Sequence, residues 1–117
     1  MKDQSIPIIN HYIALVKLGV VDESFSFIEK IAQDLINGLD LNVVKKISHV
    51  FHPKGTTLAF ILSESHLLIH TWPESGLVHI DLVTCSHPSE KEFENSLKVA
   101  FSEQKVKSIE IKSVNFD

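Results

Sequence analysis

Residues 62–85, LSESHLLIHTWPESGLVHIDLVTC, hold two short apolar runs separated by a polar break. The first run, 66–72, stops at Pro73, and the second, 76–85, begins with a glycine. Both runs are rich in residues that favour extended backbone and are bounded by turn formers, which is typical of β-strands. Glu-Ser-His precedes the first run and His-Thr-Trp-Pro-Glu closes it. A strand needs no such ends, so they are either ordinary polar flanks or carriers of chemistry.

Outward from this stretch, the apolar patterns predict four more strands and two helices. The strands are expected at residues 7–19, 41–53, 56–65 and 106–116. The first helix is expected between Asp22 and Asp40, where apolar residues recur at spacings of three and four. Asp22 or Ser24 could cap this helix, and Gly38 lies near its end.

A second helix is expected over residues 88–103. Pro88 stands near its start, and one face carries Phe93, Leu97, Ala100 and Phe101. The order is then strand, helix, several strands, helix, strand. That order predicts an α+β fold: a two-layer sandwich with two helices on one face of a largely antiparallel sheet. A length of 117 residues predicts a single domain spanning 1–117.

Composition narrows the class of protein. The net charge is −4, all eleven basic residues are scattered lysines, and arginine, the preferred side chain for bidentate phosphate and base contacts, is missing. Nucleic-acid binding is therefore not expected. No run approaches ~18 apolar residues and the N-terminus lacks signal-peptide features, so no membrane association is expected. A single cysteine allows no internal disulfide, which favours a cytoplasmic protein.

The chain has seven histidines, a residue type that commonly binds metal ions. His66 and His70 are four residues apart, a spacing that would place both on one face of a helix. On a strand the same spacing spans about 13 Å, which is too far for two ligands of one metal. A metal site would then need Cys85 or Asp81 from elsewhere in the chain, and no metal is expected.

For three further residues, the residue type alone allows both a structural and a functional role. Cys85 is either a small buried hydrophobe or an acid/base or nucleophilic group. Trp72, the only tryptophan, and Phe51, which precedes the turn HPKG, are either core anchors or surfaces for stacking.

The central residues resemble a known signature, that of the prokaryotic S-adenosylmethionine decarboxylases. The matching positions are Glu64-Ser65-His66, Ile69 to Glu74, Gly76, Asp81 and Thr84-Cys85. The stretch FHPKGTT, 51–57, is similar to a turn that precedes the signature in that family.

The resemblance implies a self-cleaving enzyme with a covalent pyruvoyl group. The Ser65 hydroxyl would attack the carbonyl of Glu64, and elimination and hydrolysis would turn Ser65 into a pyruvoyl ketone. The products would be a β chain, 1–64, and an α chain, 65–117. The ketone would form a Schiff base with the substrate amine and act as the electron sink for loss of CO2. Decarboxylated S-adenosylmethionine would then serve spermidine biosynthesis.

The resemblance also assigns roles to six side chains. His70 matches the processing base, Thr57 a hydroxyl that assists processing, and Cys85 the proton donor in decarboxylation. Because proton transfer needs hydrogen-bond reach, we expect Ser65, His70 and Cys85 to converge in space. The residues matching the substrate site are Phe51 and Trp72, for the adenine, and Glu74, for the ribose hydroxyls. Family members form dimers with sites near the interface, so a homodimer of cleaved αβ protomers is expected.

The chain departs from the family pattern around the pocket. The family's first strand usually carries Gly-x-His followed by an acid; here His11 is kept and preceded by Asn10, but Leu15 and Val16 stand where the acid is common. Ser86 stands where the family often has a glycine. Two alternatives stay open, and the departures bear on the first of them. The first is a pyruvoyl-dependent arginine or ornithine decarboxylase. The second is a non-catalytic regulatory paralogue, which the retained serine, histidine and cysteine disfavour.

Overall fold

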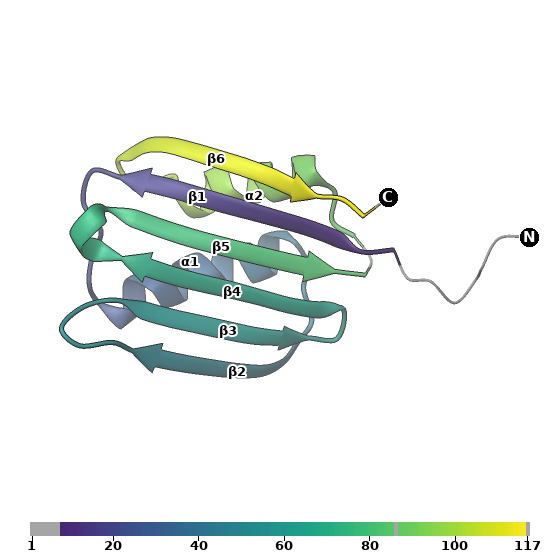
Figure 1. The fold of residues 1–117 in the computed structure, drawn as a ribbon, viewed down its shortest axis with the longest axis horizontal. Helices are drawn as coiled ribbons and strands as arrows, with labels where there is room; N and C mark the ends of the chain where they lie inside the picture. Colours follow the sequence, from purple (N-terminus) through teal and green to yellow (C-terminus); the bar gives the residue numbers. More distant parts are fainter. Residues whose placement is uncertain (1–7, 86, 117) are drawn as a thin grey trace, which may run out of the picture.

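The computed structural model describes residues 8–85 and 87–116 and contains one sheet with two helices (Figure 1). Residue 7 of the first expected strand and Ser86 lie outside the described part. The elements in chain order are β1 (Asn10–Leu18), α1 (Phe25–Gly38), β2 (Val43–Val50), β3 (Thr56–Leu62), β4 (Ser65–Trp72), a 3₁₀ turn η1 (Pro73–Ser75), β5 (Leu77–Thr84), α2 (Glu90–Ala100) and β6 (Val106–Val114). Each predicted strand and helix is present, most with somewhat shorter bounds; β4 is longer by one residue, because it begins at Ser65, which was expected at the end of the preceding strand.

The strands lie side by side in the order β2-β3-β4-β5-β1-β6, and every neighbouring pair is antiparallel. Both helices lie on the same side of the sheet (Figure 1). The predicted two-layer α+β sandwich is therefore confirmed. The other side, which we call the open face, carries no helix in the described part of the chain.

The first helix begins and packs as its sequence predicts. Ser24 is the N-cap, and its hydroxyl accepts a hydrogen bond from the backbone N–H of Phe27. Asp22 supports the cap from outside, because its carboxylate accepts the N–H of Ser24 at 2.8 Å. The side chains that α1 buries against the sheet are Ile28, Ile31, Ala32, Leu35 and Ile36.

The second helix is fixed at its start and along its buried face. Ser89 and Glu92 form a capping box, which satisfies two backbone N–H groups of the first turn. Phe93 is fully buried and stacks on Tyr12 of β1, with ring centroids 5.6 Å apart. The Tyr12 hydroxyl donates to the carbonyl of Pro88 at 3.0 Å, which joins β1 to the segment entering α2.

Loss of the Phe93 ring is expected to destabilise the fold strongly. Phe93→Ala removes a fully buried aromatic ring and leaves a cavity, which costs about 3–5 kcal/mol. Urea unfolding of a Ser65→Ala variant, in which the chain would stay whole, measures this loss. Val99→Ala on the same helix is the control, because Val99 is 68% exposed and its change is expected within about 0.5 kcal/mol. Equal losses for the two variants would contradict this packing.

Candidate active site

The residues of the expected cleavage site meet at one end of β4. Ser65, the first residue of β4, pairs with Thr84, the last residue of β5. The backbone N–H of Cys85 donates to the carbonyl oxygen of Glu64 at 3.0 Å. That oxygen belongs to the peptide bond between Glu64 and Ser65. A donor on it draws electron density from the carbonyl carbon and favours attack by a nucleophile.

Two details describe this end in the uncleaved chain. Oε1 of Glu64 is buried and has no hydrogen-bond partner within the described residues, which is an unfavourable state for a carboxylate oxygen. Ser65 is half-buried, whereas Cys85 lies past the end of β5 and is exposed. The contact between Cys85 and the cleavage site therefore runs through the backbone.

A second group of predicted residues lies at the other end of β4, on the open face. The hydroxyl of Thr57 on β3 is hydrogen-bonded to Nδ1 of His70, its direct register partner on β4. Nε2 is then the ring nitrogen left for proton transfer. The His70 ring also lies between two aromatic rings, with centroid distances of 4.1 Å to Trp72 and 5.5 Å to Phe51.

The environment of His70 favours its neutral form. Burial lowers the pKa of His70, the neighbouring charge of His79 lowers it further, and the carboxylate of Glu74 acts in the opposite direction. A histidine with a lowered pKa stays neutral as the pH falls, so it can accept a proton over a wider range. This suits the base role expected for His70.

The residues expected at the substrate are gathered beside His70. Phe51 is 41% exposed and Trp72 is 40% exposed, so each presents ring surface to a ligand. Glu74 lies in η1, directly after Trp72 and Pro73. Gly76 ends this turn in a left-handed conformation, φ 67°, and a Cβ there would lie 2.6 Å from the carbonyl oxygen of Leu18. The tight turn thus holds Glu74 at the end of β4.

The predicted convergence of Ser65, His70 and Cys85 is wrong within a single chain. Ser65 and Cys85 are backbone neighbours, but Ser65 and His70 are five residues apart on one continuous strand. At about 3.3 Å per residue their separation is about 17 Å, which is beyond direct proton transfer. The site of one chain is therefore divided into a cleavage end and a histidine end.

The register reveals two histidine contacts that the linear sequence hides. His11 of β1 lacks an acid near it in sequence, yet its Nε2 lies 2.6 Å from Oδ1 of Asp81 on β5. His79 of β5 is the direct register partner of His70. The only sequence signal for either was strand alternation, which puts Asp81 and His79 on one face of β5. Pairing of distant strands was needed to place their partners.

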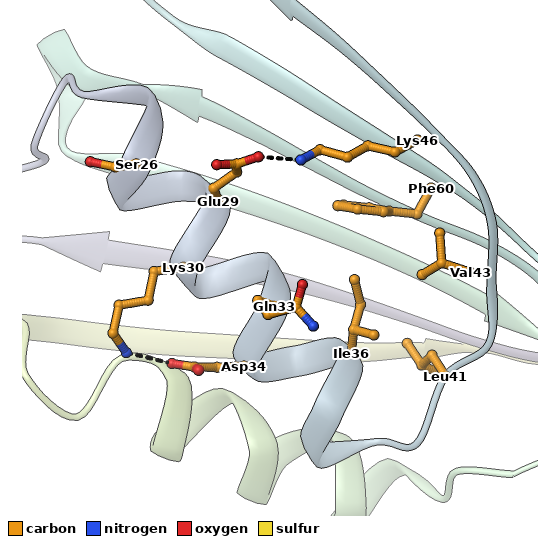
Figure 2. A pocket seen from close by; sticks show the side chains of 10 residues that line it. All are labelled: Ser26, Glu29, Lys30, Gln33, Asp34, Ile36, Leu41, Val43, Lys46 and Phe60. Carbon is orange, nitrogen blue, oxygen red and sulfur yellow. Dashed lines mark hydrogen bonds and ion pairs between the residues drawn. The ribbon is translucent and has the colours of Figure 1, made fainter.

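A hollow of about 700 Å³ lies apart from both ends of the site, between α1 and strands β2 and β3 (Figure 2). Its walls include the ion pairs Lys46–Glu29 and Lys30–Asp34, the latter at 2.9 Å, and its floor includes Phe60. None of the predicted site residues lines it. Its charges are paired with each other, so nothing marks it as part of the site.

Residues 8–85 and 87–116 contain no group of three or more His, Cys, Asp or Glu side chains arranged to hold a metal ion. Over the same residues, neither helix has the length and apolar character that crossing a bilayer requires.

Comparisons with known proteins bear on the family and the fold of this chain. The sequence model of a family described as S-adenosylmethionine decarboxylase matches residues 20–113. An S-adenosylmethionine decarboxylase proenzyme of Clostridium botulinum strain Langeland is 39% identical over 94 residues, which cover 79% of this chain and 78% of the relative. A proenzyme of the same name from Archaeoglobus fulgidus is 33% identical over 88 residues, 73% of this chain and 79% of the relative.

A solved structure shares the fold. The crystal structure of the adenosylmethionine decarboxylase from Aquifex aeolicus VF5 superposes with a TM-score of 0.75 at 24% identity, over 92% of this chain and 89% of that one. The match of the family's sequence model and the 39% identity to a relative show that this chain belongs to the S-adenosylmethionine decarboxylase family.

Proposed function

We propose that this protein is a pyruvoyl-dependent S-adenosylmethionine decarboxylase that cleaves itself between Glu64 and Ser65. The products would be a β chain of residues 1–64 and an α chain of residues 65–117. The observation that carries the proposal is the hydrogen bond from the Cys85 N–H to the Glu64 carbonyl, 3.0 Å long, on the bond to be broken. Family membership and the kept Ser65, His70 and Cys85 agree with it.

Self-cleavage follows from the groups at the two ends of the site. The Ser65 oxygen adds to the Glu64 carbonyl carbon, with the Cys85 N–H on the carbonyl oxygen, and the Ser65 nitrogen leaves to give an ester. His70 then removes the α-proton of residue 65, and the Glu64 carboxylate departs as the new end of the β chain. Addition of water and loss of ammonia leave a pyruvoyl group on residue 65. Cleavage also frees the buried, unpartnered Glu64 side chain to move.

The remaining residues would act on the substrate. The pyruvoyl group would supply the electron sink for loss of CO2. The Cys85 thiol would give a proton to the substrate carbon, and cleavage would free residue 65 to turn toward it. Phe51 and Trp72 offer stacking surface for an adenine, and Glu74 offers a carboxylate for ribose hydroxyls. The product would be decarboxylated S-adenosylmethionine, the aminopropyl source for spermidine biosynthesis.

A homodimer would unite the two ends of the site. The cleavage end and the histidine end lie about 17 Å apart on β4, so one chain cannot bring them together. The middle of the open face is largely apolar, with Ile47 at 52% and Leu68 at 37% exposure. The lateral row through it contains Ile47, Ala59, Leu68, Asp81, Ile13 and Lys112.

A two-fold axis across the strands at about Leu68 would stack the open faces of two copies with their β4 strands antiparallel. The cleavage end of each copy would then face the histidine end of the other. The His70 that serves Ser65 would come from the second copy, and so would Thr57, which is bonded to it.

Mixed dimers test this arrangement. Alone, His70→Ala is expected to stay whole because it lacks the base, and Ser65→Ala because it lacks the nucleophile. When the two are co-expressed with different tags, the His70→Ala chain is expected to be cleaved, since its partner supplies His70. Mass spectrometry of the separated chains gives the readout.

The control partner carries both substitutions, Ser65→Ala and His70→Ala, and is expected to give no rescue. An uncleaved His70→Ala chain in isolated mixed dimers would mean that the base does not cross between copies.

Turnover of three substrates tests the chemistry proposed. Release of CO2 is expected from S-adenosylmethionine, with arginine and ornithine turned over at least 100-fold less efficiently, because Phe51 and Trp72 have no base to stack on in those amino acids. CO2 from arginine or ornithine alone would show that the same chemistry serves another substrate.

A further inference from the structure

One lateral row of the open face crosses all six strands and carries three histidines. Its members, each the direct register partner of the next, are His49, Thr57, His70, His79, Leu15 and Glu110. Directly paired residues on one face of a sheet have Cβ atoms about 5 Å apart. The row therefore places His79 beside His70, on the side opposite Thr57.

Ring contacts further define the position of His79 beside His70. The Trp72 ring lies against both imidazoles, with centroids 4.1 Å from His70 and 6.4 Å from His79, the latter edge-on. His79 also lines a hollow of about 190 Å³ on the open face, together with Ile13, Leu15, Glu110 and Lys112. The His79 side chain is thus half-buried. Trp72 and His70 contact it on one side, and on the other side it faces the hollow lined by Glu110 and Lys112.

We propose that His79 is a positioning residue for self-cleavage, which keeps His70 in the neutral form that accepts the proton of residue 65. This inference rests on the base role proposed for His70. His79 contacts neither the cleaved bond nor the expected substrate residues other than Trp72, so its effect passes through His70.

The electrostatics follow from which charges face the pair. Burial comes first in lowering the pKa of His70, and a charge on His79 adds to it, because two imidazolium ions side by side repel each other. Glu74 opposes both. Thr57 on β3 is neutral, and Asp81, on the same face of β5 as His79, is paired with His11. The charges facing His79 from β6, on Glu110 and Lys112, are of opposite sign.

The sign of the pH effect is then determined. Removing the charge of His79 takes away one cause that lowers the pKa of His70, so His70 gains its proton at a higher pH. Cleavage that needs neutral His70 would slow in the acidic range and stay unchanged where His70 is neutral in both proteins.

The experiment compares self-cleavage of freshly translated chains shifted to buffers between about pH 5.5 and pH 8.5. Two variants remove the charge: His79→Gln, and His79→Phe, which keeps a ring edge against Trp72. Both are expected to cleave about threefold more slowly than the native chain near pH 6 and equally fast near pH 8. The matched control is His49→Gln, since His49 lies in the same row but contacts Phe51 and is separated from His70 by β3. It is expected to keep the native profile.

Each other result overturns the inference. An unchanged profile in both His79 variants, or the same shift in His49→Gln, would remove His79 from the process. A shift in the glutamine variant alone, or slower cleavage at every pH, would show a packing role in place of an electrostatic one. The variant His70→Gln distinguishes failure of this inference about His79 from failure of the base role proposed for His70. Normal cleavage by that variant would refute the base role itself.

Discussion

Replacing Ser65 by alanine is expected to leave a single chain of 13.2 kDa with no decarboxylase activity. Alanine lacks the oxygen that must add to the Glu64 carbonyl, and the Cys85 N–H on that carbonyl cannot substitute for a nucleophile. Without cleavage no pyruvoyl group forms, so decarboxylation is lost together with processing. Gel electrophoresis follows the first loss and CO2 release the second.

Ser63→Ala is the matched control for this change. Ser63 is an exposed serine two residues before Ser65, and its hydroxyl accepts a hydrogen bond from Asn42 at 3.2 Å. Its loss leaves the Glu64–Ser65 bond and the Cys85 contact in place, so normal cleavage is expected. Cleavage of the Ser65→Ala chain at the same position would show that another group is the nucleophile.

Replacing Cys85 by alanine is expected to separate the two activities. The backbone N–H that bonds to Glu64 remains, so the chain is still expected to be cleaved. The thiol is lost, and decarboxylation is expected to fall about 10²- to 10⁴-fold, the usual contribution of a general acid. The measurement is kcat for CO2 release, normalised to the pyruvoyl content of the cleaved protein.

Two outcomes would contradict this role of Cys85. Full activity in the cleaved Cys85→Ala protein would mean that the proton comes from another group. Failure to cleave, in a variant that folds normally, would place the thiol in processing instead.

Local sequence patterns were sufficient to predict the architecture. The two apolar runs of residues 62–85 became β4 and β5, and the spacing of apolar residues after Ser24 became α1. These elements depend on interactions within a few residues, such as the hydroxyl of Ser24 on the N–H of Phe27. Such interactions join residues that are close in the sequence, so they can be predicted from a single sequence.

The arrangement of the site depends on pairings between distant residues. The bond from Cys85 to Glu64 and the pair of His11 with Asp81, 70 residues apart, arise from the antiparallel register of the strands. The expectation that His70 meets Ser65 failed in one chain because both lie on the same straight strand. A motif that is compact in sequence is extended in a strand, so its two ends lie far apart in one chain; the second copy that we propose would bring them together.

The intact mass of the purified protein under denaturing conditions tests self-cleavage most directly. The native sequence is expected to give two species that break between Glu64 and Ser65, with the C-terminal one beginning with a pyruvoyl group in place of serine. A single species at 13.2 kDa after long incubation would contradict it and would favour a non-catalytic regulatory paralogue.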